Sequence, residues 1–305
     1  MSVLTRPRTP GVSSRRGLSD GQFALLLTLP GLALFASIVL YPFVASLLSG
    51  FFEQSLVRPG REFTGLSNYV DLINGQFLPV LRNTVVFTLA CTAIPFVIGM
   101  ALALALNTRI RANGFLRGAF LLPWIVPSVV VSFLWLWIFN ANYGVLNGAL
   151  LQLGIGDGDT AWLGQPGTAM AAVIIAKSWA TFPWMMVMLL AGLQTVPGEL
   201  LEAAAVDGAG AVRRFVSITL PQMKGVIGIV LLLETIWNFQ HFDTIYVLTG
   251  GGPAGATTIF SVAVYDLAFR GFDLGAAGAL GGLWVLVLTG LVVLYVRHAE
   301  KGDPA

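Results

Sequence analysis

The sequence predicts an all-α membrane protein with six transmembrane helices. Of its 305 residues, 56% are hydrophobic and only 10% are charged. A soluble domain averages about 25% charged residues, so this chain has too little polar material to cover a globule of its size. The apolar residues also gather in six segments that are each long enough to cross a bilayer.

Segment length defines the predicted spans, since about 20 residues at a rise of about 1.5 Å cross the hydrocarbon core. The spans are residues 23–48, 83–106, 118–139, 168–193, 225–248 and 274–296. The first follows Arg15 and Arg16, as a signal peptide would, but it is longer than a signal-peptide core and lacks a clear cleavage site. We therefore expect a retained first helix.

The basic residues predict which loops are cytoplasmic. One side of the predicted membrane carries Arg6, Arg8, Arg15, Arg16, Arg109, Arg111, Arg117, Arg213, Arg214, Lys224, Arg297 and Lys301. The other side holds only Arg58, Arg61, Arg82 and Arg270. By the positive-inside rule, both termini are expected to be cytoplasmic, and the segments between spans one and two, three and four, and five and six external.

This topology divides the chain into four parts. Residues 1–22 are predicted to be a cytoplasmic tail and residues 23–48 the first transmembrane helix. Residues 79–297 form the core membrane domain, which contains the longest cytoplasmic loop, 196–223. Residues 298–305 are a second cytoplasmic tail.

The 196–223 loop has the pattern of two short amphipathic helices joined at glycine. Pro197 and the acidic residues Glu199 and Glu202 suit a helix start, and Gly208 suits its end. A second helix is expected over 212–219, closed by Leu220-Pro221. Such a loop either docks a cytoplasmic protein or lies on the lipid headgroups, and composition does not separate the two.

The spacing within this loop resembles the EAA loop of ABC-importer permeases. The matching residues are Glu202-Ala203-Ala204, Gly208 and Ile218-x-Leu220-Pro221. In that family the loop is a coupling helix seated in the ATP-binding subunit. The resemblance implies a type I ABC-importer permease fold, and it implies ATPase coupling by Glu202, Ala203, Ala204, Asp207 and Gly208.

Further motifs are similar to those of carbohydrate-uptake permeases, among them the larger maltose permease subunit and glycerol-phosphate permeases. They are Gly65-Leu66-Ser67-Asn68-Tyr69, Arg82-Asn83-Thr84, Leu122-Pro123-Trp124-Ile125-Val126-Pro127-Ser128, Phe139-Asn140, Tyr143-Gly144, Asn147, Tyr246 to Pro253, and Thr257. This similarity implies four kinds of partner besides membrane lipid. They are a second homologous permease, two ATP-binding cassette subunits carrying ATP and Mg, and an external solute-binding protein, while this chain itself binds no cofactor.

Missing motifs argue against an enzyme. The sequence has no G-x-x-x-x-G-K-[S/T] phosphate loop. Its two histidines are far apart and its one cysteine, Cys91, lies in an apolar segment, so a typical zinc site is not expected. The net charge of +2 without a long basic run also argues against nucleic acid as a partner.

Polar residues inside the predicted spans are candidates for a solute site, because charges at bilayer depth usually face the bundle interior or a wet cavity. Three spans each carry polar or aromatic residues spaced as on one helix face, here called a polar stripe. The stripes are Trp124 and Ser128, then Lys177 and Thr181, and then Glu234, Asn238 and His241. They could line a solute cavity, or Lys177 and Glu234 could form a structural ion pair. The residues alone leave both open.

The resemblance to the larger maltose subunit implies sugar contacts at all seven positions. That protein has neutral polar groups where this chain has Lys177 and Glu234, which argues against maltose itself. A charged or differently sized glycoside, or a phosphorylated polyol held by Lys177, remains open.

Two other classes of protein are alternatives for this sequence. A secondary transporter would use Glu234, His241 and Asp243 as a proton relay, and a non-transporting scaffold would leave the polar stripes unexplained. A secondary transporter would also leave the EAA-like loop unexplained.

Overall fold

The computed structural model describes residues 19–108 and 113–301, so the basic residues before position 19 and Arg109 and Arg111 lie outside the described residues. The described regular structure is helical, apart from a small antiparallel sheet of β1 (Phe52–Gln54) and β2 (Arg61–Phe63). The chain divides into two compact units, Met1–Leu48 and Ser49–Ala305.

The described part of the first unit is a single apolar helical stretch. It consists of α1 (Asp20–Phe35), the π-helical turn η1 (Ala36–Leu40) and most of α2 (Tyr41–Ser49). At its start Ser19 and Gln22 form a reciprocal capping box, which satisfies backbone N–H groups at the helix end. The stretch Gly21–Ser49 is long and apolar enough to cross a membrane, close to the predicted 23–48.

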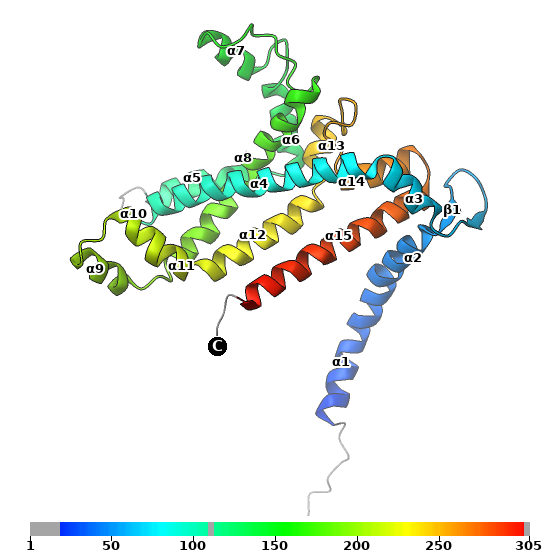
Figure 1. Cartoon of the computed structure of the whole chain (residues 1–305), viewed down its shortest axis with the longest axis horizontal. Coiled ribbons are helices and arrows are strands. Elements are labelled where there is room, and N and C mark those ends of the chain that lie inside the picture. Colours follow the sequence, from blue (N-terminus) through cyan, green and yellow to red (C-terminus); the bar gives the residue numbers. More distant parts are fainter. Residues whose placement is uncertain (1–18, 109–112, 302–305) are drawn as a thin grey trace, which may run out of the picture. The chain divides into compact units, whose positions relative to one another are not determined.

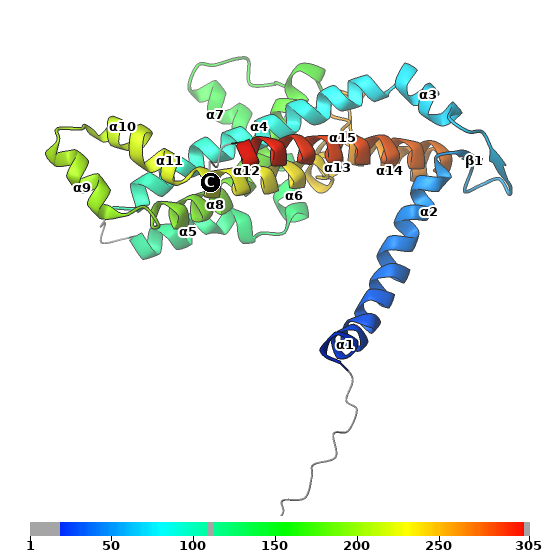
Figure 2. The same ribbon diagram turned by 60° about the horizontal axis from the view of Figure 1, so that its bottom comes forward.

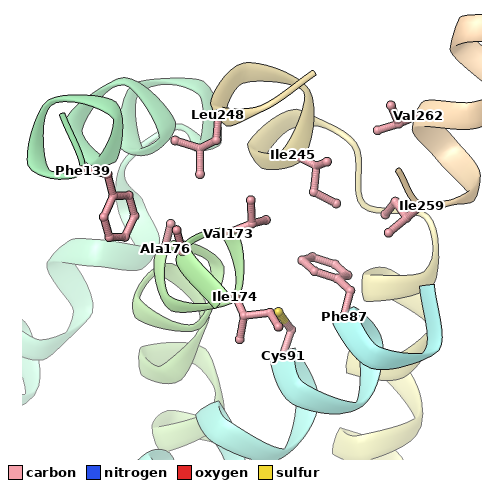
Figure 3. Packing of buried hydrophobic residues seen from close by; sticks show 11 residues of the cluster. Phe87, Cys91, Phe139, Val173, Ile174, Ala176, Ile245, Leu248, Ile259 and Val262 are labelled. Atoms are coloured by element: carbon pink, nitrogen blue, oxygen red, sulfur yellow. The ribbon is translucent and has the colours of Figure 1, made fainter. Parts of the chain in front are cut away.

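The centre of the second unit is a pair of long parallel helices, α4 (Phe77–Leu106) and α8 (Pro166–Leu193), with α12 (Lys224–Phe239) packed against both (Figures 1 and 2). Gly99 allows the close approach of α4 and α8, because a Cβ there would lie 2.8 Å from Met185 Cβ. Figure 3 shows the buried apolar contact in the N-terminal halves of the two helices, where Phe87 and Cys91 of α4 lie near Ile174 of α8.

The third predicted span is broken, so the prediction of one continuous helix over 118–139 is wrong. The structure has α5 (Asn113–Ile125) and α6 (Ser128–Ile138), which meet at an angle of 91°. The reason is Pro127, because a proline disfavours helical backbone at the residue before it and lacks the N–H that would continue the helix.

The fifth predicted span, 225–248, is also broken. Helix α12 ends at Phe239, and α13 (Asp243–Leu248) begins after a three-residue link. The link is held by tertiary hydrogen bonds: Ser261 Oγ donates to the His241 carbonyl, and Ser128 Oγ donates to Asp243 Oδ2 at 2.6 Å. Helix α13 ends where the sequence predicted a stop, and Gly250 follows with φ of +58°.

The last long helix, α15 (Leu274–Lys301), begins at the predicted position. Among the described residues, four helical stretches are long and apolar enough to span a membrane: Gly21–Ser49, α4, α8 and Leu274–Val293 of α15. Counting each bent pair as one span raises the possible number to six. The shorter elements α3 (Ser67–Asn74), α14 (Phe260–Tyr265) and the π-helical η3 (Asp266–Arg270) pack against α15 and cap one end of the bundle, whereas α7 (Val145–Gln152) packs against α6.

Asparagines from the motifs noted above hold these capping segments in place. Asn68 Nδ2 donates to the carbonyls of Gly50 and Phe52 at 3.0 and 2.9 Å. Asn83 Nδ2 donates to the carbonyls of Gly255 and Thr258 at 2.9 and 3.1 Å, although these residues are more than 170 positions away. These motif residues therefore organise the loops.

Candidate functional site

The predicted polar residues of α8 and α12 come together inside the bundle. Glu234 is 1% exposed and Asn238 is fully buried, one turn apart on α12, while Lys177 of α8 is half-buried. Lys177 lies within electrostatic range of Glu234 and His241. Among the residues that the structure describes, however, no ion pair joins Lys177 to Glu234.

Three buried polar atoms of α4 and α12 have no hydrogen-bond partner within the described chain. They are Glu234 Oε1, Asn238 Oδ1 and Thr88 Oγ1. The Asn238 amide uses only its donor side, giving a hydrogen bond to Thr92 Oγ1 at 3.2 Å. Leaving a buried polar atom unpaired costs about 1–3 kcal/mol, so such a cluster is typical of a site that meets a polar ligand.

His241 lies beside this cluster but not on the helix face that the spacing predicted, because α12 ends two residues before it. Its ring stacks on Phe87 with centroids 5.9 Å apart, and its Nε2 lies 2.8 Å from Thr244 Oγ1. The prediction of one face is therefore confirmed for Glu234 and Asn238 and wrong for His241.

Trp124 and Ser128 do not share a helix face either, since the break at Pro127 places them on α5 and α6. Trp124 is 54% exposed near the end of α5. Ser128 opens α6 and is engaged with Asp243 of α13, so it lies where α6 meets the link after α12. Thr181, one turn beyond Lys177 on α8, is buried.

A tryptophan pair next to the polar residues was missed by the sequence reasoning. Trp184 of α8 and Trp237 of α12 lie with ring centroids 5.0 Å apart, and Trp237 is 45% exposed. Trp184 follows Lys177 by seven residues and Trp237 follows Glu234 by three, so each shares a helix side with a polar candidate. That spacing was the sequence signal from which the tryptophan pair could have been predicted. The pair offers partly open aromatic surface beside unpaired polar atoms.

The predicted coupling loop forms the two helices expected from its sequence. Helix α9 (Gly198–Val206) ends in a Schellman arrangement, in which Ala209 N donates to the Ala204 carbonyl and Gly208 N to the Ala205 carbonyl. Gly208 has φ of +80°, a conformation that favours glycine.

The second helical stretch runs through α10 (Ala211–Arg214), the π-helical η2 (Phe215–Thr219) and α11 (Leu220–Gln222). The prediction that Leu220-Pro221 closes it is wrong. Pro221 has no N–H to donate, and it follows the π-helical turn η2. The helix nevertheless continues past Pro221 to Gln222 and bends by 70° at Met223.

The side chains predicted to couple lie mainly on the surface of this loop. Glu202, Ala203, Asp207 and Gly208 are exposed, and Ala204 is half-buried. A hollow of about 220 Å³ lies between the two helices and is lined by Ala204, Asp207, Ala209, Arg213, Arg214, Ser217 and Ile218.

The base of the loop packs into the bundle. Val196, Phe215 and the fully buried Met223 join an apolar cluster with residues of α4, α5 and α8. The base of the loop is therefore continuous with the packing of the long helices.

The sequence matches the family described as "Binding-protein-dependent transport system inner membrane component" over residues 95–302. It is 37% identical over 284 residues to the trehalose/maltose transport system permease protein MalF of Thermococcus litoralis, covering 93% of this chain and 94% of that protein. It is 36% identical to the sulfoquinovosyl glycerol transport system permease protein SmoG of Agrobacterium fabrum, covering 94% and 93%.

Solved structures show the same fold. A chain of a bacterial ABC transporter involved in the import of the acidic polysaccharide alginate superposes with a TM-score of 0.78 at 21% identity. The superposition covers 92% of this chain and 95% of that chain.

Proposed function

Because the chain belongs to the family of inner membrane components of binding-protein-dependent transport systems, we propose that it is the permease subunit of an ATP-driven importer that carries a sugar into the cytoplasm. The observation that carries this proposal is one helix that carries the polar residues in its middle and the coupling loop at its end. Helix α8 holds Lys177, Thr181 and Trp184, and its last turn leads directly into the coupling loop.

The sugar site consists of the polar cluster and the tryptophan pair. Faces of Trp184 and Trp237 pack against the C–H surfaces of a sugar ring, as aromatic rings do with apolar surfaces. Lys177, Thr181, Glu234 and Asn238 exchange hydrogen bonds with hydroxyl groups, and unpaired buried acceptors such as Glu234 Oε1 gain partners when the sugar binds. Trp124, Ser128 and His241 border the site.

Energy comes from partner subunits, since the coupling loop is built to receive them. Helix α9 presents Glu202, Ala203, Asp207 and Gly208 to an ATP-binding cassette subunit, two of which hold ATP and Mg. Their closure moves the loop, and the apolar cluster at its base passes the motion to α4 and α8. A second permease completes the path, and an external binding protein delivers the solute.

The topology in the membrane follows the charge distribution. We place both termini and the loop 196–223 in the cytoplasm and count each bent helix pair as one span, which gives six. The break between α5 and α6 and the link after α12 then lie at the sugar site, where irregular backbone borders a cavity.

An anionic glycoside or a polyol phosphate is a second candidate substrate. Lys177 is a half-buried cation without an ion-pair partner in the described chain, and a guanidinium or ammonium group in this setting recognises sulfonate or phosphate. Relatives at 36% and 32% identity are named for sulfoquinovosyl glycerol and sn-glycerol-3-phosphate transport.

The test is ATP hydrolysis by the complete complex in nanodiscs. A panel of solute-binding proteins from the source organism is added, each loaded in turn with trehalose, maltose, sulfoquinovosyl glycerol or glycerol-3-phosphate. We expect one loaded protein to stimulate hydrolysis and a sugar to be the effective solute. Stimulation by amino acids or metal ions alone, or by no binding protein, would contradict the proposal.

A further inference from the structure

Helix α4 carries a row of three buried threonines. Thr84, Thr88 and Thr92 are spaced by four residues, which places them on one side of the helix, and they are between 0% and 8% exposed. A buried hydroxyl group needs a hydrogen-bond partner, because leaving it unpaired away from water costs free energy. The three hydroxyls differ in their partners, so they differ in what they do.

Thr84 is a structural residue. Its Oγ1 donates to the Val80 carbonyl at 2.7 Å and accepts from the Phe260 backbone N–H at 3.1 Å. The second of these bonds joins α4 to the start of α14, so the hydroxyl of Thr84 is used within the fold. One turn further along, the buried Thr88 hydroxyl has no hydrogen-bond partner among the described residues.

Thr92 is bonded to the polar cluster of α12. Its Oγ1 accepts a hydrogen bond from Asn238 Nδ2 at 3.2 Å. Asn238 is fully buried, and its Oδ1 has no partner in the part of the chain that the structure describes. Thr92 therefore holds the amide by its donor end and leaves the acceptor end unpaired.

The orientation of the Asn238 amide decides what this side of the site recognises. A carboxamide oxygen only accepts hydrogen bonds, whereas the NH2 group only donates them. With Nδ2 held by Thr92, the atom that remains for a ligand is Oδ1. Glu234 Oε1, one turn earlier on α12, is a second unpaired acceptor. A ligand that fits must donate hydrogen bonds, as sugar hydroxyls do and the ionised oxygens of phosphate or sulfonate do not.

We propose that Thr92 is a positioning residue of the sugar site, which fixes the Asn238 amide so that Oδ1 accepts a hydrogen bond from one hydroxyl group of the solute. The α12 side therefore recognises the hydroxyl-bearing part of the solute, and an anionic group, where the solute has one, lies toward Lys177 of α8. The proposal rests on the proposed function, because it takes Asn238 as a sugar contact.

The first test uses analogues of the sugar that is effective in the panel experiment. In each analogue one hydroxyl is replaced either by hydrogen or by fluorine, which accepts hydrogen bonds weakly and cannot donate them. Uptake into vesicles containing the complete complex is measured at saturating loaded binding protein. At one position of the sugar, both replacements should lower wild-type uptake about tenfold, because each leaves a buried acceptor unpaired.

The second test releases the amide. Thr92→Val has a similar shape but no hydroxyl, so the Asn238 amide can rotate and present Nδ2 to the solute. Uptake of the fluoro analogue should then exceed that of the deoxy analogue about threefold, because an N–H group can donate to fluorine but not to a C–H group. Thr92→Ser keeps the hydroxyl and should restore the equal penalties of the wild type. Thr92→Ala is the second variant, and it should shift the ratio in the same direction as Thr92→Val.

Thr84→Val is the matched control, since it removes a buried hydroxyl from the same row of α4. It should lower the unfolding temperature of the complex, because the Phe260 N–H loses its acceptor, yet leave the ratio of fluoro to deoxy uptake as in the wild type. A loss of stability alone therefore does not imitate the effect expected at Thr92.

Two results would overturn the positioning role while leaving the proposed function intact. One is a wild type that takes up every fluoro analogue as fast as the parent sugar. The other is an unchanged ratio of fluoro to deoxy uptake in both Thr92→Val and Thr92→Ala, which would make Thr92 a packing residue only. If no sugar in the panel stimulates the wild type, the proposed function and this inference fall together.

Discussion

The coupling loop and the polar cluster of α8 and α12 are built in opposite ways. The loop is exposed, and its shape depends on local chemistry such as the Schellman arrangement at Gly208. The cluster is buried, and its shape depends on α4, α6, α8, α12 and α13 meeting correctly. Substitutions at the exposed residues of α9 should therefore affect coupling alone, whereas those in the cluster should affect stability and substrate together.

The largest expected effect is at Glu202 in the loop. Glu202→Lys should abolish uptake and weaken co-purification with the ATPase, because truncating or reversing one side of a charged pair across an interface costs about 2–5 kcal/mol. Insertion in the membrane should persist, since Glu202 is exposed and packs on nothing in the core. Glu199→Lys, on the same helix, is the control, and uptake at the wild-type rate by Glu202→Lys would contradict the assignment.

The next effect is on the stability of the cluster. Lys177→Met and Glu234→Met should each lower the unfolding temperature of the purified complex. If the two charges pair during the transport cycle, the double variant should lose about 0.5–3 kcal/mol less than the sum of the singles. Strictly additive losses would show that the charges act separately. In that case Lys177→Met should instead change which solutes stimulate ATP hydrolysis.

A smaller effect distinguishes two glycines of the loop. Gly208→Ala places a Cβ on a residue with φ of +80° and should cost about 1–2 kcal/mol, lowering uptake about fivefold to thirtyfold. Gly210→Ala is the matched control, because Gly210 has φ of −65° and open space around its Cβ position. Equal uptake by the two variants would show that the turn geometry does not matter.

The smallest effect is at the tryptophan pair. Trp237→Ala should lower uptake about twofold to tenfold at saturating loaded binding protein, given that aromatic stacking contributes about 0.5–1.5 kcal/mol. Trp137→Ala, on α6 and 69% exposed, should leave uptake unchanged. Equal losses in the two variants would remove the pair from the sugar site.

The same contrast explains what could be predicted from sequence. Spans, the helix stop after Leu248 and helix α9 with its glycine end follow from local composition and turn chemistry, so they were predictable. The break at Pro127 could be predicted in part, because a proline disfavours helical backbone angles at the residue before it, Val126. The break after Phe239 was not, since it depends on Ser261 bonding to His241 across the fold. The shared face of Trp184 and Lys177 was visible in the spacing but was overlooked.

The ATP requirement of transport tests the central claim most directly. The chain is reconstituted in vesicles with its partner subunits and the loaded binding protein, and the ATPase is inactivated by one substitution at its catalytic carboxylate. We predict that solute accumulation stops while binding of the loaded protein persists. Accumulation that continues unchanged, or that follows an imposed proton gradient instead, would contradict the account and favour an ion-coupled transporter.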